Sequence, residues 1–120
     1  MSYQVIEKNK MKYISLNHSG NLIRTEADAL ELLSVCMENE TNLLLIPGER
    51  LPAEFYQLST GIAGAVLQKF VLYGIKCAVV LDKDFGQGRF RDLLIESNRG
   101  NAFRLYTGIG EAESWLLNQH

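Results

Sequence analysis

The segment NLLLI at residues 42–46, which Pro47 and Gly48 follow directly, decides the fold of this chain. Its apolar run is nearly continuous, whereas a strand with one face in water would alternate apolar and polar residues. Pro and Gly then end the strand. The pattern therefore predicts a central strand that is covered on both faces. The segment IKCAVVL at residues 75–81 is also aliphatic and partly β-branched, so it predicts a second central strand.

Before the central strand at residues 42–46, residues 26–38 show the apolar spacing of an amphipathic helix. Thr25 and Asp28 form a short-armed capping box at its start. The stripe expected to face the sheet consists of Ala29, Leu30, Leu33, Cys36 and Met37.

A second helix is predicted at residues 59–73, between the two central strands. Ser59 is its expected N-cap, and Gly74 is its expected C-terminal stop. Its inward stripe is expected to contain Ile62, Ala63, Val66, Leu67 and Phe70. The other predicted elements are strands at 3–7, 11–16 and 103–106, a third helix that ends at Gly100, and a fourth helix at 111–117.

This order of elements predicts an α/β fold with a mixed, largely parallel sheet, an N-terminal antiparallel hairpin and about four helices. The strand–helix–strand units require right-handed connections between parallel neighbours. No linker, repeat or low-complexity segment interrupts the 120 residues, so we expect a single domain over residues 1–120.

The charge balance excludes several classes of partner. The chain has 12 Lys and Arg against 14 Asp and Glu, a formal net charge of −2, so it lacks the basic excess of a nucleic-acid-binding domain. No apolar stretch approaches the roughly 20 residues of a membrane helix, so we expect no membrane contact. Residues 1–12 carry no apolar signal segment, which predicts a cytoplasmic protein.

The residues with reactive side chains do not form a catalytic or metal-binding pattern. Cys36 and Cys77 lie among aliphatic neighbours without a CxxC spacing, so we expect buried, reduced thiols and neither metal nor cofactor. His18 has no nucleophile or carboxylate near it in the sequence. We therefore assign no catalytic residue.

The candidate binding residues follow the predicted parallel strands, because open α/β sheets bind ligands at the carboxyl ends of their strands. Ser59, Thr60 and Gly61 begin a helix, where unpaired N–H groups and the helix dipole can hold an anion or a covalent phosphate. Arg50, Lys83 and Arg89 can add positive charge there, although a solvated helix face explains Lys83 and Arg89 equally well. The motif alone favours the simpler interpretation that Ser59 is only a cap.

The same helix has a second unusual feature, a face of small residues opposite its aliphatic stripe. Gly61, Gly64 and Ala65 recur at helical spacing and Gln68 follows them. Each glycine inside a helix costs about 1 kcal/mol relative to alanine. Two of them indicate that something approaches the backbone closely, and another element of the fold and a partner protein are equally good candidates.

Two segments carry a resemblance to a known family. FYQLSTGIAG at residues 55–64, continued by LQKF at 67–70, and FRDLLIESNRG at 90–100 resemble the bacterial family called domain of unknown function 4180. The likeness extends over essentially the whole chain. It implies membership of the family and no activity.

The order of elements also resembles the STAS domain, the fold of anti-sigma factor antagonists (SpoIIAA-like proteins). In those antagonists a partner kinase phosphorylates a serine at the corresponding helix start, which breaks their complex. Ser59 and Thr60 stand at the matching positions, while Leu58 stands where the antagonists have Asp. The resemblance implies a phosphoregulated docking helix with Ser59 or Thr60 as the modified residue.

These observations rank three classes of function. The first is a non-enzymatic cytosolic regulatory domain that docks a partner through the helix at residues 59–68. The second is a protein or enzyme that binds a small anionic ligand at the strand ends, near Ser59, Arg50 and Lys83. The third is a structural subunit whose glycine face packs in a homodimer.

Overall fold

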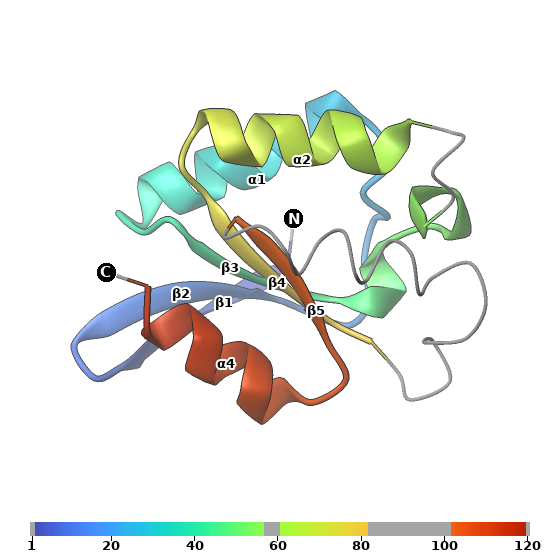
Figure 1. The fold of residues 1–120 in the computed structure, drawn as a ribbon. Coiled ribbons are helices and arrows are strands. Elements are labelled where there is room, and N and C mark those ends of the chain that lie inside the picture. Colours follow the sequence, from blue (N-terminus) through green and yellow to red (C-terminus); the bar gives the residue numbers. More distant parts are fainter. Residues whose placement is uncertain (1, 57–60, 82–101, 120) are drawn as a thin grey trace.

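The computed structural model describes residues 2–56, 61–81 and 102–119. In chain order the elements are β1 (Tyr3–Lys8), β2 (Met11–Leu16), α1 (Glu26–Glu38), β3 (Leu43–Pro47), the short 3-10 helices η1 (Gly48–Arg50) and η2 (Ala53–Tyr56), α2 (Ile62–Leu72), β4 (Lys76–Val80), β5 (Phe103–Tyr106) and α4 (Ile109–Leu117). Figure 1 shows helices on both sides of one sheet.

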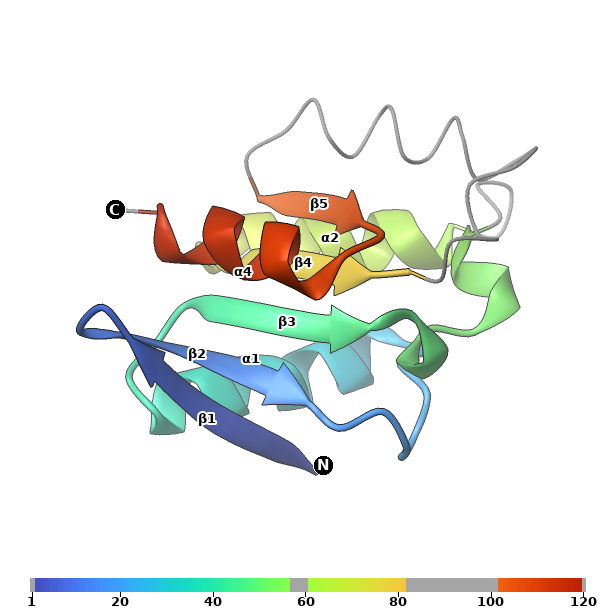
Figure 2. The same ribbon diagram turned by 90° about the horizontal axis from the view of Figure 1, so that it is seen from below.

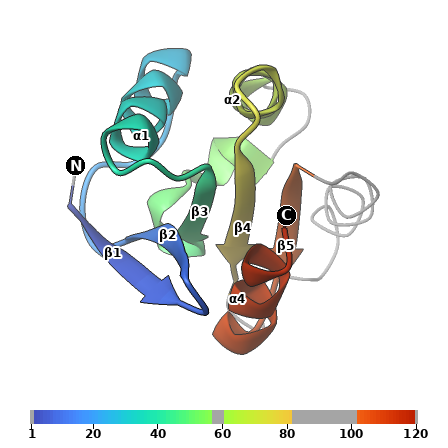
Figure 3. The same ribbon diagram turned by 90° about the vertical axis from the view of Figure 1, so that its left-hand side faces the viewer.

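The sheet has the spatial order β1-β2-β3-β4-β5. β1 and β2 form an antiparallel hairpin, and β2, β3, β4 and β5 are parallel to their neighbours. α1 and α2, the crossovers into β3 and β4, lie on the same face of the sheet, and α4 lies on the other (Figure 3). The predicted mixed, largely parallel α/β fold with its N-terminal hairpin is therefore confirmed, and three helices belong to the described residues.

All five residues of β3 are buried, as the aliphatic run predicted. Leu44 and Ile46 belong to the core beneath α1 and α2, whereas Leu43 and Leu45 belong to the core beneath α4. Side chains alternate between the two faces of a strand, so β3 contributes to both cores at once. It is the strand that the rest of the fold covers.

Helix α1 has the predicted bounds and the predicted capping box, but its buried stripe is partly different. The amide of Asp28 donates to the hydroxyl of Thr25, and the Asp28 carboxylate accepts from the Thr25 amide. Leu30 and Met37 are exposed, so their assignment to the core was wrong. The helix is rotated toward Leu32 and Val35, since the stripe through Ala29, Leu32, Leu33 and Cys36 also satisfies helical spacing.

Helix α2 begins at Ile62 with Gly61 as its N-cap, so the prediction of Ser59 as the cap was wrong. Gly61 has φ +74°, a left-handed conformation that glycine adopts readily and that interrupts a right-handed helix. The inward stripe is confirmed, with Ala63, Val66 and Phe70 buried.

The predicted stop of α2 at Gly74 is confirmed. Gly74 has φ +71° and its amide donates to Val71, while the amide of Ile75 donates to Phe70, which is a Schellman motif. The strand predicted at 103–106 is β5, and the last helix begins at Ile109, two residues earlier than predicted. The predicted third helix lies outside the described residues.

Helix α4 is tied to the hairpin by Glu113. Its carboxylate accepts a hydrogen bond from the Tyr13 hydroxyl at 2.5 Å and one from the Lys8 ammonium at 3.0 Å. These contacts lower the pKa of Glu113. The hydrogen bond from Tyr13 contributes most and that from Lys8 comes next, while partial burial acts in the opposite direction. The contact joins the last helix to the first two strands.

This lowered pKa predicts how stability depends on pH. A carboxylate whose pKa is depressed in the folded state stabilises it above the unfolded-state pKa, about 4.3, and loses that contribution as the pH falls further. We expect the urea midpoint to fall less between about pH 7 and pH 3 in Glu113→Gln than in the wild type. Glu111→Gln, an exposed position of the same helix, should keep the wild-type pH profile. Equal profiles for all three proteins would contradict the assignment.

Candidate functional site

The structure describes four of the residues that the sequence analysis selected: Arg50, Gly61, Gly64 and Gln68. Ser59, Thr60, Lys83 and Arg89 lie outside the described residues. Arg50 lies at the carboxyl edge of the sheet, directly after β3, and the other three lie on α2. The candidate residues thus divide between a sheet edge and a helix surface.

Arg50 is only 1% exposed and holds the loop that follows β2. Its Nε donates to the carbonyl of Asn21 and its Nη1 to that of Asn17, both at 2.9 Å. Burial lowers the pKa of the guanidinium, and the charge of Glu31 opposes this shift. Within the described residues, Nη2 has no hydrogen-bond partner. We expected the guanidinium of Arg50 to hold an anion, but most of its described hydrogen bonds go to backbone carbonyls.

Gly20 provides the space for this arrangement. A Cβ at this position would lie 2.9 Å from Cζ of Arg50, and the backbone has φ +145°, which other residues rarely adopt. The loop can close around the guanidinium because residue 20 has no side chain. Sequence alone gave no signal for this close approach.

The same edge holds a contact between two side chains that the sequence analysis missed. Nδ1 of His18 lies 2.6 Å from a carboxylate oxygen of Glu49, although 31 positions separate them in the chain. His18 follows β2 and Glu49 follows β3, and these strands are parallel neighbours. The carboxyl ends of these two strands lie side by side. The predicted parallel sheet could therefore have indicated that His18 and Glu49 lie close together.

The small-residue face of α2 points away from the core. Gly61, Gly64 and Gln68 are exposed, and a Cβ built at either glycine would meet no atom within 4 Å. Among the described residues, no element of the fold fills the space that the glycines leave. The same face continues into Val71 and Leu72, which are 64% and 67% exposed. This surface, from Gly61 to Leu72, we call the outward face of α2.

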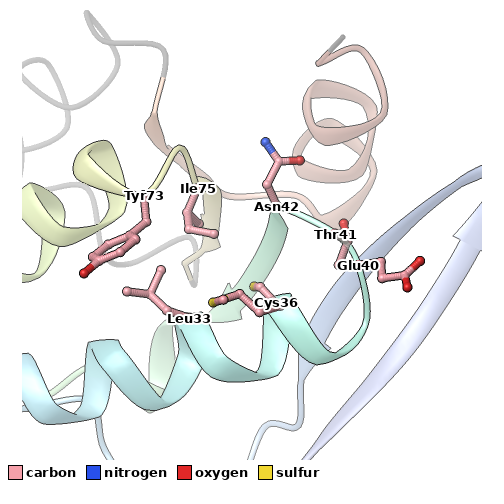
Figure 4. A pocket seen from close by; sticks show the side chains of 8 residues that line it. Leu33, Cys36, Glu40, Thr41, Asn42, Tyr73 and Ile75 are labelled. Atoms are coloured by element: carbon pink, nitrogen blue, oxygen red, sulfur yellow. The ribbon is translucent and has the colours of Figure 1, made fainter.

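An apolar pocket of about 520 Å³ lies beside the end of this face. Figure 4 shows Leu33 and Cys36 of α1 facing Tyr73 and Ile75, which follow α2. Met37, 74% exposed, also lines it. Met37, Val71, Leu72 and Tyr73 are four of the seven large apolar side chains exposed in the described part of the chain. They gather at the C-terminal ends of α1 and α2.

This end of the molecule carries charges of both signs. α1 and α2 both run from the carboxyl to the amino edge of the sheet, so the negative ends of both dipoles lie there. Glu38 and Glu40 add charge at the end of α1, whose last turn contains no basic residue. Lys69 in the last turn of α2, and Lys10 and Lys12 near Glu40, add positive charge, so charges of both signs border the apolar pocket.

The two cysteines are buried, reduced thiols in the structure, as predicted. Burial raises the pKa of Cys36 to about 11 and raises that of Cys77 well above its ordinary value. Thiolates are the reactive species, so both side chains are inert at neutral pH. The described residues contain no cluster of His, Cys, Asp or Glu that could hold a metal ion. Nor does any described helix combine the length and apolar character needed to cross a membrane.

The fold and these surfaces define a small mixed α/β domain with an open helix face and a buried arginine clamp. The chain belongs to the family described as "Domain of unknown function (DUF4180)", whose model matches residues 8–116. No curated protein and no solved structure matches the chain.

The Arg50 clamp gives a prediction about stability. Arg50→Met leaves the carbonyls of Asn17 and Asn21 without their donors, so we expect a loss of about 2–3 kcal/mol in the free energy of unfolding. Urea denaturation measures it. Arg24→Met, at an exposed position, should change stability by less than about 0.5 kcal/mol. A loss as small in Arg50→Met as in this control would show that the clamp does not hold the loop.

The buried thiols give a prediction about reactivity. In folded protein at about pH 8, we expect iodoacetamide to alkylate both cysteines at least about a hundredfold more slowly than in urea-unfolded protein. Intact mass followed over time measures the rates. A cysteine that reacts as fast folded as unfolded would contradict its burial.

Proposed function

We propose that this chain is a non-enzymatic cytoplasmic regulatory domain of STAS-like fold that docks a protein partner through the outward face of α2. The single observation that carries the proposal is the open space beside Gly61 and Gly64, which continues into exposed Val71 and Leu72. The element order, with a hairpin, α/β crossovers and a terminal helix, supports the STAS-like part of the proposal.

The outward face of α2 has the composition that helix docking needs. Gly61 and Gly64 allow a partner backbone to approach closely, and Val71 and Leu72 supply apolar area worth about 25 cal/mol for each Å² removed from water. The pocket between Met37 and Tyr73 is large enough to receive an apolar side chain of the partner. Contiguous exposed apolar residues of this kind mark interaction sites.

The outward face of α2 and the pocket beside it fit an apolar segment. Val71 and Leu72, together with the apolar lining of the pocket, favour a partner that supplies apolar anchors. The docked element is thus a segment of another protein whose apolar side lies on α2.

Phosphorylation of Ser59 or Thr60 gives the docking a switch. A phosphate brings about 1.5 to 2 negative charges. Both residues directly precede Gly61, so a partner that covers the outward face of α2 would have to bury or repel that charge. Modification therefore releases the partner.

The substitution Gly64→Arg tests the docking face. Its side chain enters open space and replaces a helical glycine, so the variant should fold and gain helix stability of about 1 kcal/mol or less. Gly110→Arg is a matched control, because Gly110 is a helical glycine of α4 whose Cβ also meets nothing. Cross-linking and affinity capture from a lysate of the source organism should recover the partner with wild type and Gly110→Arg. Gly64→Arg should lose at least about nine tenths of it.

Light scattering and intact mass complete the test. A wild-type dimer that Gly64→Arg dissociates would identify a second copy as the occupant in place of another protein. Incubation with lysate and ATP should produce a form heavier by one phosphate at Ser59 or Thr60. Equal capture by Gly64→Arg and wild type would refute docking at this face.

A further inference from the structure

A second pocket, of about 530 Å³, opens at the carboxyl edge of the sheet, on the face that carries α4. Leu16 at the end of β2, Pro47 at the end of β3 and Val80 at the end of β4 all line it. Open α/β sheets bind ligands outside the carboxyl ends of their strands. Its volume lies within the range of about 300–1,000 Å³ that small-molecule sites occupy.

The pocket exists because α4 covers the sheet unevenly. α4 packs along β3, β4 and β5, and Figure 2 shows the hairpin extending beyond it. Glu113 bridges α4 to Lys8 and Tyr13. Near the first turn of α4, Ile109 instead borders the pocket, opposite the residues of the hairpin.

The lining combines an apolar floor with four polar residues, and besides Asn17 and His18 it contains two polar side chains that face the same way. Ile6, Leu45 and Val80 form the floor. Gln4 and Ser15 are direct cross-strand partners, so both project to the pocket side. Among the described residues, neither side chain makes a hydrogen bond. A carboxamide and a hydroxyl together offer donors and acceptors within one small area.

The charges around the pocket indicate an uncharged ligand. Its described lining contains no Lys, Arg, Asp or Glu. His18 lies at the rim with Nδ1 against Glu49, so that pair is already matched. The guanidinium of Arg50 is turned toward the carbonyls of the loop at residues 17–21. A ligand with a carboxylate or phosphate would lose its hydration here without gaining a cation from the described lining.

We propose that this pocket binds an uncharged, flat ring with an amide-type edge. The ring lies on Ile6, Leu45 and Val80, and the neighbouring donor and acceptor of the edge pair with Gln4 and Ser15. The site is on the opposite face of the sheet from the outward face of α2, so it does not depend on the proposed docking.

A matched pair of probes tests the chemistry. Benzamide and benzoate share one ring and differ in the charge of the polar group, and 2-pyridone is a second uncharged amide. In ¹⁵N–¹H spectra, benzamide and 2-pyridone should shift the amides of Ser15, His18 and Ile109 saturably. Molecules of this size bind with dissociation constants of about millimolar. Benzoate should bind at least about tenfold more weakly.

Two substitutions of the same type locate the polar contact. Gln4→Leu removes the carboxamide at an exposed edge position and should weaken benzamide binding about fivefold to tenfold. Gln68→Leu, on α2, should leave it unchanged, and Ser15→Ala should repeat the effect of Gln4→Leu. The proposal is overturned if neither amide probe gives saturable shifts up to about 20 mM. Equal binding of benzoate, full affinity in Gln4→Leu and Ser15→Ala, or shifts centred on Tyr73 would also overturn it.

Discussion

Strand β3 has no exposed residue, and this two-sided burial is the constraint on which the rest of the structure depends. Leu44 and Ile46 require a cover on one side, which α1 and α2 provide, and Leu43 and Leu45 require one on the other, which α4 provides. One short helix cannot cover a five-stranded sheet, so α4 meets the hairpin through Glu113 and leaves part of the sheet face open near Ile109. The pocket at the carboxyl edge follows from the same constraint that fixes the fold.

The strands and helices could be predicted because their signals are local. Thr25 and Asp28 cap α1, and Gly74 stops α2, through contacts with residues a few positions away. The choice between two adjacent apolar stripes is not local. Leu30 and Met37 satisfy helical spacing as well as Leu32 and Val35 do, and only packing against the sheet decides between them. Ser59 has the preferred chemistry of a cap, but the left-handed backbone of Gly61 sets the helix start two residues later.

The candidate site was less predictable because its contacts join distant parts of the chain. The sequence placed Arg50 at the correct edge of the sheet, yet its charge suggested an anion rather than three neighbouring backbone carbonyls. Those carbonyls become available only when the loop after β2 folds over the end of β3, with Gly20 against the guanidinium. His18 and Glu49 meet because the two strands before them are neighbours in the sheet. The order of elements suggested that the strands are neighbours, but no single motif indicated the contact.

The two proposed surfaces share a physical property, since neither is explained by the stability of the isolated domain. Single exposed apolar residues such as Val5 are ordinary on a protein surface and require no explanation. Val71, Leu72 and Tyr73 differ because they are consecutive, because Tyr73 lines an apolar pocket, and because Val71 and Leu72 continue the face that contains Gly61 and Gly64. Likewise, an apolar side chain at position 15, in a strand with neighbours on both sides, would extend the apolar floor formed by Ile6, Leu45 and Val80 better than Ser does. Departures from the pattern that favours folding concentrate at functional sites, and here they occur on opposite faces of one sheet. A substitution at one surface therefore leaves the other intact, which makes the two proposals separable by experiment.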